Sequence, residues 1–140
     1  MFQKFIVAGY LGGDPEMRYL PDGTAVTNFS VAATRRFTDK DGQPREETTW
    51  IRVETWRKLA ENCNQYLARG SAVIIEGRLK PDPNTGGPRT FTRQDGTVGA
   101  SFEVVAENVR FLSRGNGTGA ENGYAEEAVA AAQAEDDIPF

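Results

Sequence analysis

Nine consecutive residues decide the fold: Thr48-Thr49-Trp50-Ile51-Arg52-Val53-Glu54-Thr55-Trp56. Their side chains alternate with the period of two that is typical of a β-strand. Ile51 and Val53 therefore face one side, as ordinary core residues. The opposite side carries Trp50, Arg52, Glu54 and Trp56. This alternation predicts a half-buried strand with an aromatic and charged outer face.

The pattern changes at Arg57, where apolar residues begin to recur at helical spacing. These residues are Leu59, Cys63, Tyr66 and Leu67. The spacing predicts one short amphipathic helix, with Gly70 as its left-handed C-terminal cap. Cys63 lies on the apolar side of this helix, so we expect it to be a packed core thiol.

Two strands are predicted before the central stretch. Phe5 to Leu11 is a nearly continuous apolar run that stops at Gly12-Gly13-Asp14-Pro15, which indicates a strand buried on both faces. Pro21-Asp22-Gly23 is a strong turn signal, and a second strand is predicted after it, from Thr24 to Arg36. Asp39 to Pro44 then marks an exposed turn.

Two further strands are predicted after the helix, from Ala72 to Leu79 and from Ala100 to Leu112. The connection from Lys80 to Gly99 is dense in Pro and Gly, which excludes a helix and predicts a protruding, flexible hairpin or loop. Five strands with a helix between the third and the fourth match a five-stranded Greek-key OB barrel. The predicted fold class is therefore mainly all-β.

The chain of 140 residues has room for one folded domain and a tail. Residues 113–134 are rich in Gly, Asn, Ala and Glu, which predicts a disordered or transiently helical linker. Residues 1–112 carry a net charge of +1 and residues 113–140 a net charge of −5. We therefore expect an OB domain over 1–112, a flexible linker over 113–134 and an acidic tip over 135–140, and we judge nucleic-acid binding on the nearly neutral domain.

The composition excludes several kinds of chemistry. The chain has no histidine and one cysteine, which excludes intrachain disulfides, histidine-based acid–base catalysis and a Cys/His zinc site. We predict no catalytic residues, no metal site and no cofactor. No apolar run has the length of a membrane span and the first residues lack a signal-peptide layout, so we expect a cytoplasmic protein with no membrane partner.

The outer face of the central strand suits unpaired nucleic acid. Trp50 and Trp56 flank Arg52, and such a surface stacks bases on aromatic rings while cations meet phosphates. The neighbouring predicted strands and the long connection supply similar groups: Arg35, Phe37, Arg78, Lys80, Arg89, Phe91 and Arg93. One alternative is that the tryptophans fill a dimer interface or a second core. For the segment around Phe91, the alternative is a solvated loop with one packed ring.

The last six residues combine acidic groups with an apolar end: Glu135-Asp136-Asp137-Ile138-Pro139-Phe140. The carboxylates suit a basic pocket on another protein, Pro139 restricts the backbone, and Phe140 supplies an aromatic anchor. We therefore predict that Asp136 to Phe140 bind partner proteins. The alternative is a tail that only increases solubility.

Several stretches together resemble the bacterial single-stranded-DNA-binding proteins along nearly the whole chain. The stretches are Leu11-Gly12-Gly13-Asp14-Pro15-Glu16 with Arg18-Tyr19, Gly23-Thr24-Ala25-Val26, Thr49-Trp50-Ile51-Arg52-Val53, Lys58-Leu59-Ala60-Glu61, Tyr66-Leu67, Arg69-Gly70-Ser71, Ile75-Glu76-Gly77 and the terminal Asp137-Ile138-Pro139-Phe140. Their order along the chain and the terminal tetrad together carry the resemblance, since no single stretch is decisive.

The resemblance implies an OB fold, usually a homotetramer, that binds single-stranded DNA in replication, recombination and repair in the bacterial cytoplasm, associated with the nucleoid. It implies base stacking on Phe37, Trp50, Trp56 and Phe91, and phosphate contacts from Lys4, Arg52, Lys58, Arg69 and Lys80. It also implies that the terminal tip docks replication, recombination and repair proteins. The chain departs from the best-known members at several positions, since Phe37 and Phe91 stand in place of Trp, Trp56 in place of Phe, and Ile51 in place of a common His.

Three alternatives remain open at this level. An RNA-binding OB domain would use the same stacking chemistry, because stacking does not distinguish the sugars. An enzyme could hold Mg²⁺ between paired carboxylates, either Asp39 with Asp41 or Asp14 with Glu16. A pure interaction protein would bury its tryptophan face in an interface.

Overall fold

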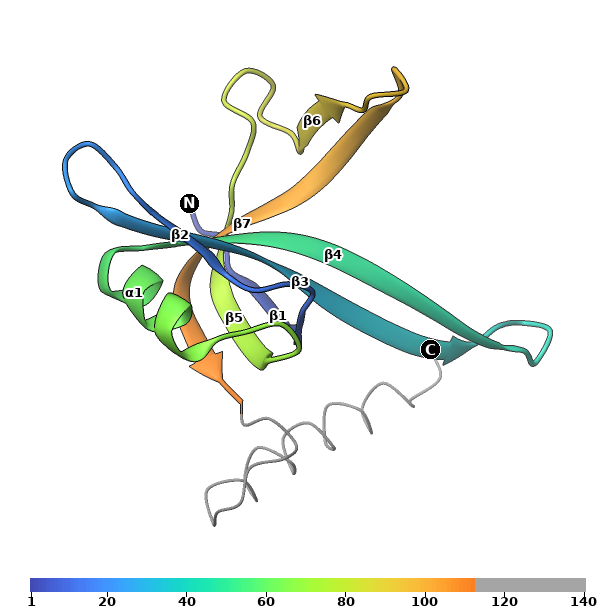
Figure 1. Cartoon of the computed structure of the whole chain (residues 1–140). Coiled ribbons are helices and arrows are strands. Elements are labelled where there is room, and N and C mark those ends of the chain that lie inside the picture. The colour runs from blue at the N-terminus through green and yellow to red at the C-terminus, as the bar shows by residue number, and fades with distance from the viewer. Residues whose placement is uncertain (113–140) are drawn as a thin grey trace, which may run out of the picture.

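A computed structural model describes residues 1–112 of the chain. The predicted linker over 113–134 and the predicted tip over 135–140 lie outside the described residues. The described part forms seven strands and one helix (Figure 1). In chain order these are β1 (Phe5–Leu11), β2 (Glu16–Tyr19), β3 (Ala25–Thr38), β4 (Pro44–Trp56), α1 (Arg57–Tyr66), β5 (Ala72–Leu79), β6 (Arg89–Thr92) and β7 (Val98–Phe111).

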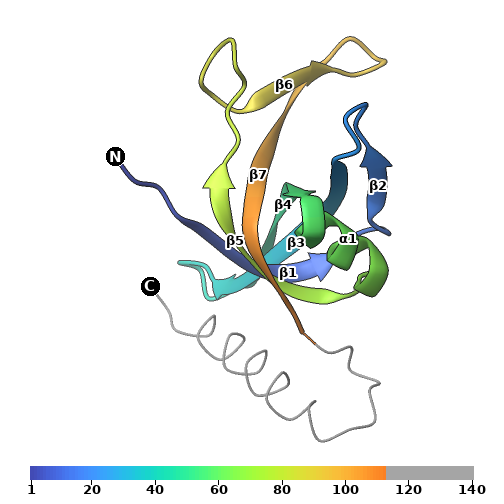
Figure 2. The same ribbon diagram turned by 90° about the vertical axis from the view of Figure 1, so that its left-hand side faces the viewer.

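Five of the strands close a barrel in the order β1-β5-β7-β4-β3. The circle is completed where β3 returns to β1, with Tyr10 opposite Ala32 and Leu11 opposite Val31. β4 and β7 run parallel, and the other neighbours in the barrel run antiparallel. This is the predicted mainly-β OB barrel, with α1 between its third and fourth strands (Figure 2).

The barrel interior is filled by the inward residues of all five strands. The buried core consists of Leu11, Phe29, Val31, Ile51, Val53, Cys63, Leu67, Val73, Ile75, Val104, Ala106 and Val109. Two glycines let neighbouring backbones approach closely in the wall, since a Cβ at Gly9 would meet the carbonyl oxygen of Ala32 and a Cβ at Gly77 that of Val105. Closure of the barrel therefore depends on glycine at both places.

The first predicted strand is present at the predicted residues, but the prediction that it is buried on both faces is wrong. Its side chains alternate along β1, with Phe5 and Val7 half-buried and Ile6 and Tyr10 exposed. A strand in a barrel wall has one inner face, so a nearly continuous apolar run need not mean burial on both sides. The outer face of β1 is consequently an exposed apolar surface.

The helix α1 begins directly after the last residue of β4, and Arg57 changes the direction of the chain there with a left-handed φ of 59°. Ala60 and Cys63 are buried beneath it, which confirms the core thiol, and burial raises the pKa of Cys63 to about 11. The expectation for Tyr66 is wrong, because its ring is exposed. It lies at the end of the helix and contacts only the ring of Phe111 among aromatic neighbours in the described residues.

The predicted helix cap is also displaced. The helix ends at its C-cap residue Leu67, whose N–H donates to the carbonyl of Cys63. Gly70 does have the expected positive φ, 85°, but it serves the following turn, where its N–H donates to the carbonyl of Leu11. The sequence therefore indicated the conformation of Gly70 correctly and assigned it to the wrong element.

Two strands were not predicted. β2 pairs with the start of β3, and β6 pairs with the start of β7. The second forms a hairpin within the connection from Lys80 to Gly99, which confirms the protruding hairpin expected there. The predicted exposed turn at Asp39 to Pro44 is also present, and it caps an arm because β3 and β4 extend well beyond the barrel (Figure 1).

Candidate nucleic-acid interface

The pairing of β4, β7 and β6 brings several of the predicted contact residues onto one outer face of the barrel. On β4 Trp50 and Arg52 point outward, since Ile51 and Val53 between and beside them are buried. Arg52 lies opposite Glu103 of the parallel strand β7. Along β7 the same face continues through Ser101, which pairs with Arg89 of β6. Residues from three strands therefore form one surface.

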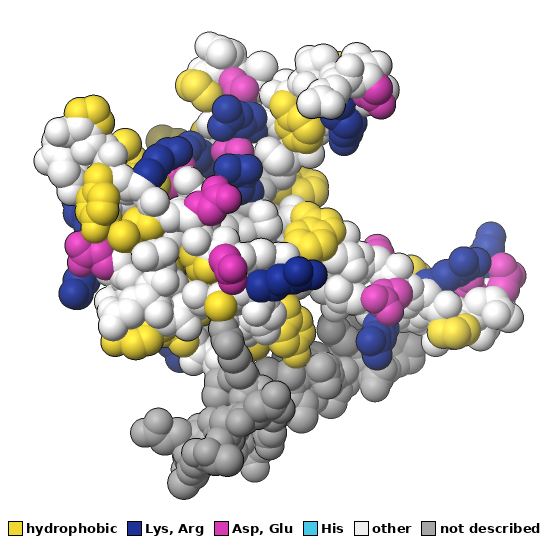
Figure 3. Space-filling view, viewed as in Figure 1, with side chains coloured by type: hydrophobic (Ala, Val, Ile, Leu, Met, Phe, Trp, Pro, Cys, Tyr) yellow, Lys and Arg dark blue, Asp and Glu magenta, His cyan; other side chains and the backbone are white. Residues whose placement is uncertain are grey.

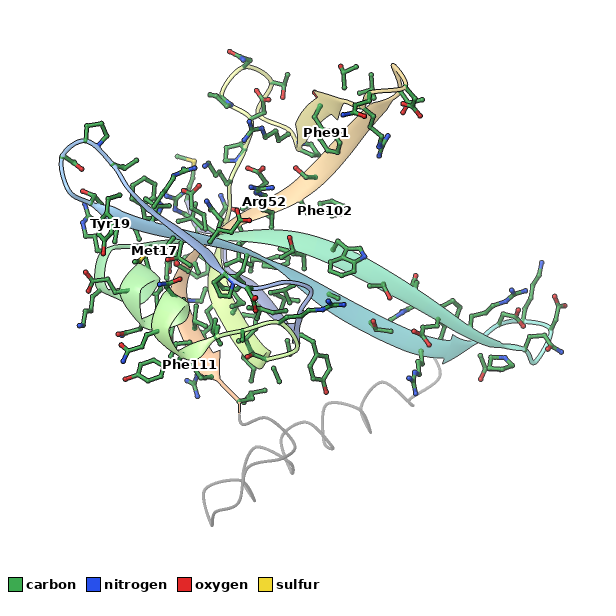
Figure 4. All side chains as sticks on the ribbon, viewed as in Figure 1. Met17, Tyr19, Arg52, Phe91, Phe102 and Phe111 are labelled. Carbon is green, nitrogen blue, oxygen red and sulfur yellow. The ribbon has the colours of Figure 1, made fainter. Side chains whose placement is uncertain are left out.

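This surface is hollowed into a groove of about 430 Å³, which we call the hairpin groove. Its lining residues are Ser30, Trp50, Ile51, Arg52, Arg89, Phe91, Ser101, Phe102 and Glu103. Phe91 and Arg52 lie on opposite sides of the opening between the β6 hairpin and β4 (Figure 4). The groove thus combines aromatic rings, cations and one carboxylate.

A second groove of about 490 Å³ lies on the other side of Trp50, and we call it the turn groove. It is lined by Gly12, Gly13, Asp14, Glu16, Asn28, Phe29, Ser30, Trp50 and Arg52. Trp50 and Arg52 line both grooves and so form the ridge between them. Trp50 is 56% exposed, so its side chain is accessible to a ligand.

Several of the cations predicted to contact phosphates already form ion pairs with carboxylates of the protein. Arg89 forms an ion pair with Glu103 at 3.8 Å, and the Glu103 side chain is only 9% exposed. Lys80 forms an ion pair with Glu54 at 2.6 Å. The other carboxylate oxygen of Glu54 accepts a hydrogen bond from the indole N–H of Trp56 at 2.7 Å. Cations and carboxylates are accordingly interspersed on this side of the molecule (Figure 3).

Other predicted cations have no carboxylate partner within residues 1–112. Arg52 on the ridge and Arg78 on β5 are exposed and form no ion pair there. Arg93 lies over the ring of Phe91 at 5.4 Å from its centre. Arg69 lies beside the turn groove, because its backbone N–H donates to the carboxylate of Asp14. These arginines are therefore available to phosphates without prior separation of an ion pair.

Arg35 and Phe37 do not join the ridge. Along β3 they follow Phe29 and Val31 in the inward alternation, whereas Trp50 pairs with Ala32 on the outward face. They lie on the arm beyond the barrel, with the guanidinium of Arg35 over the ring of Phe37 at 4.7 Å. The two residues therefore occupy the opposite face of the β3–β4 ribbon from Trp50, and their contact with nucleic acid stays a prediction.

Two further predicted cations lie outside both grooves. Lys4 pairs with Glu76 and Glu107, on the part of the barrel wall built from β5 and β7. Lys58 is in the first turn of α1 and pairs with Glu61. Neither lysine lines the grooves, so a strand of nucleic acid that reached them would have to continue around the molecule.

One residue of the hairpin groove was missed from the sequence. Phe102 alternates with Val104 and Ala106, so it has the position of an inward core residue, yet the residue is 56% exposed. The reason is that β7 leaves the barrel here: β4 pairs with it only from Phe102 onward, and the residues before it pair with β6 alone. Phe102 therefore adds an aromatic ring to the groove (Figure 4).

One member of each carboxylate pair considered for Mg²⁺, Asp39 and Asp14, accepts structural hydrogen bonds. Asp39 accepts hydrogen bonds from the backbone N–H groups of Asp41 and Gln43 and from the guanidinium of Arg45. The Arg45 hydrogen bond in particular lowers the pKa of Asp39. Within residues 1–112, no group of three or more Cys, Asp or Glu side chains is placed to hold a metal ion.

The one helix of the described residues, α1, is not long and apolar enough to span a membrane.

Known proteins resemble this chain in sequence and in structure. Residues 2–112 match the single-strand binding protein family. The single-stranded DNA-binding protein of Neisseria meningitidis serogroup B is 39% identical over 125 residues, which cover 86% of this chain and 68% of that protein. The Bacillus cereus protein of the same name is 38% identical over 123 residues, which cover 88% of this chain and 67% of that protein.

The fold has a counterpart among solved structures. The small single-stranded DNA-binding protein of Streptomyces coelicolor superposes with a TM-score of 0.63 at 27% sequence identity. The superposition covers 78% of this chain and 93% of that one. The similarity therefore includes most of the described barrel.

Proposed function

The chain belongs to the single-strand binding protein family, and we propose that it binds single-stranded DNA along the ridge of Trp50 and Arg52 and into the two grooves beside it. The observation that carries this proposal is the shared outer face of β4, β6 and β7, which joins aromatic rings to cations on one open surface. Every base has a π face, so such a platform accepts bases without demanding a sequence.

The mechanism is passive binding. Bases stack on Trp50, Phe91 and Phe102, and each stacked base contributes about 1 to 3 kcal/mol. Phosphates first meet Arg52, which forms no ion pair within residues 1–112. At Arg89 a phosphate replaces Glu103 as the partner, so part of the Coulomb attraction is offset by the loss of the ion pair. Binding the unpaired strand in preference to duplex melts hairpins by mass action.

The remaining predicted contacts extend this path. We propose that they lie where the strand continues beyond the grooves, around the barrel and along the arm. They are Lys4, Arg35, Phe37, Trp56, Lys58, Arg69, Arg78, Lys80 and Arg93. Their separation favours a strand that wraps the domain over one that crosses it at a single point.

The biological role we propose is protection of unpaired DNA in replication, recombination and repair, without catalysis, in the bacterial cytoplasm at the nucleoid. The exposed apolar outer face of β1, which includes Ile6 and Tyr10, supports association of several copies, and we propose a homotetramer. We also propose that Asp136 to Phe140 recruit partner enzymes. Deletion of these five residues should abolish partner binding and modestly tighten DNA binding, because the acidic tip competes with DNA for the cationic face.

The direct test is fluorescence anisotropy with labelled oligo-dT, a duplex of equal length and oligo-U. We expect the protein to bind oligo-dT far more tightly than duplex, and with an affinity that falls as salt rises. Replacing Trp50 by Ala should weaken binding roughly 5-fold or more, the equivalent of one stacked base. Equal affinity for duplex, or an unchanged Trp50→Ala variant, would contradict the proposal, and tighter binding of oligo-U would assign the surface to RNA.

A further inference from the structure

Two of the three aromatic rings that line the hairpin groove, those of Trp50 and Phe91, each lie against a glycine of a neighbouring segment. A Cβ at Gly12 would lie 2.5 Å from Cζ3 of Trp50 and 2.8 Å from its Cη2. A Cβ at Gly99 would lie 2.7 Å from Cζ of Phe91 and 2.6 Å from Nη2 of Arg93. Distances under about 3 Å are too short for a carbon contact, because non-bonded carbons prefer about 3.5 to 4.0 Å.

The Trp50 ring reaches Gly12 across β3. Trp50 is opposite Ala32 on that strand, and the N–H of Gly12 donates to the carbonyl of Ser30 at 3.0 Å. Ala32 and Ser30 are small, so the indole can extend over them from β4 to the residue that follows β1. The hydrogen bond holds the Gly12 backbone in place, so an added methyl group would displace the indole.

The Phe91 ring rests on its direct cross-strand partner. Gly99 lies opposite Phe91 in the β6–β7 hairpin, and Gly99 is buried although its neighbours on both sides along the strand are exposed. The cover comes from Phe91 and from Arg93, whose guanidinium lies over the same ring. The glycine therefore sets the height and tilt of the ring at the mouth of the groove.

These glycines differ from those that close the barrel. At Gly9 and Gly77 the obstacle to a Cβ is backbone, which cannot move without opening the wall. At Gly12 and Gly99 the obstacle is the far end of a side chain, which can rotate away. A methyl group at these two positions should therefore move a ring and leave the fold intact.

We infer that Gly12 and Gly99 are positioning residues that hold Trp50 and Phe91 in the orientation that stacks bases. The inference rests on the proposed single-stranded DNA binding and names how the chain arranges its platform. Both rings are restrained on one side by the glycine-bearing segment and exposed on the other. Such pre-ordering lowers the cost of fixing side chains when a ligand binds.

The chain offers matched controls for both positions. A Cβ at Gly13 would meet nothing within 4 Å, and one at Gly87 would meet only Oγ1 of Thr85 at an ordinary 3.7 Å. Gly13→Ala therefore makes the same substitution next to Gly12, and Gly87→Ala makes it near the β6 hairpin. Thermal unfolding of all four variants establishes that each one folds.

The test combines a DNA-free readout with binding. In the free protein, the indole N–H resonance of Trp50 should shift in Gly12→Ala and stay in place in Gly13→Ala, with Tm little changed in both. Anisotropy with an oligo-dT of roughly ten nucleotides, within the range that one OB fold binds, should show affinity lowered roughly 5-fold or more in Gly12→Ala and in Gly99→Ala. Gly87→Ala, which lies outside both grooves, should bind like the wild type, whereas Gly13→Ala is the control for the Trp50 resonance only, because Gly13 lines the turn groove.

A double-mutant cycle shows whether Gly12 acts through the ring. In a Trp50→Ala background, Gly12→Ala should change affinity less than about twofold, because the ring that it displaces is gone. An equal loss in both backgrounds would overturn the inference, and so would wild-type affinity in Gly12→Ala and Gly99→Ala. Failure of the wild-type protein to bind oligo-dT would instead reject the proposed function, while the resonance shift would still report whether the ring rests on Gly12.

Discussion

The carboxylate of Glu103 lies inside the hairpin groove, where DNA phosphates would arrive, and we expect Glu103→Gln to tighten DNA binding. Glu103 is 3.8 Å from Arg89 and lies opposite Arg52 in the register. A phosphate on the guanidinium of Arg89 would bring two negative charges to roughly 7 Å from each other, since a charge-assisted hydrogen bond adds about 2.8 Å. Glutamine keeps the size of the side chain and removes this repulsion.

The magnitude follows from Coulomb's law. Two unit charges at about 7 Å repel by roughly 0.6 kcal/mol in water and by roughly 2.4 kcal/mol at an effective dielectric constant of about 20. The groove is partly open, so we expect about 1 kcal/mol, which is roughly a 5-fold gain in affinity. The charge of Arg89 would no longer be offset by Glu103, so the phosphate bound there would be fully neutralised and the slope of log affinity against log salt should steepen by about 0.7.

The assay is anisotropy of a labelled short oligo-dT at several salt concentrations. Glu46→Gln is the matched control, because Glu46 forms a similar ion pair at 3.5 Å with Arg36. It lies six residues before Arg52 on β4, about 20 Å away, which is roughly two Debye lengths at 0.1 M salt. An unchanged affinity and slope in Glu103→Gln, or a gain of equal size in Glu46→Gln, would refute the reasoning.

Three further predictions concern stability. Gly77→Ala should lower the free energy of unfolding by about 2 kcal/mol or more, measured by denaturant titration, because a Cβ would strike the backbone of Val105, whereas Gly87→Ala should cost little. Cys63 should resist labelling by maleimide at pH 8 until the protein unfolds, and rapid labelling of the native protein would contradict this. The free energy of unfolding should fall as pH rises from about 9 towards 11, because the thiol ionises at lower pH in the unfolded chain than in the folded one. The pKa of Asp39 is lowered, so the stability that its carboxylate adds to the arm is present above about pH 4 and is lost as pH falls further. The amide resonance of Gln43, whose N–H donates to this carboxylate, should therefore shift in acid, and Asp39→Asn should abolish that shift.

Local pattern was enough to predict the wall strands of the barrel, because each is an apolar or alternating run and most of them are bounded by glycine or proline. The central strand shows this most clearly, with Ile51 and Val53 buried and Trp50 and Arg52 outward as expected. The strands β2 and β6 have only four residues each. Strands that short carry little periodicity, and their pairing partners, β3 and β7, hold them in place.

Four of the predicted contact residues, Trp50, Arg52, Arg89 and Phe91, line the hairpin groove, but the arrangement of the others was not predicted. The alternation through Phe29 and Val31 already places Phe37 on the inner face of its strand, so its separation from Trp50 could have been predicted by extending that count. Phe102 was not predictable in this way, because its exposure depends on where β7 leaves the barrel. The contacts of Trp50 with Gly12 and of Phe91 with Gly99 were also not predictable, because each joins two segments that no local sequence pattern connects.

The central claim is that bases stack on the ridge of Trp50 and Arg52, and one titration tests it most directly. Oligo-dT is added to the Trp56→Phe variant, in which Trp50 is the remaining one of the two tryptophans, while its fluorescence is followed at low and high salt. We predict strong, saturable quenching that needs more DNA at high salt. Tight binding measured by anisotropy with no change in Trp50 fluorescence would contradict the account, because the DNA would then lie elsewhere on the protein.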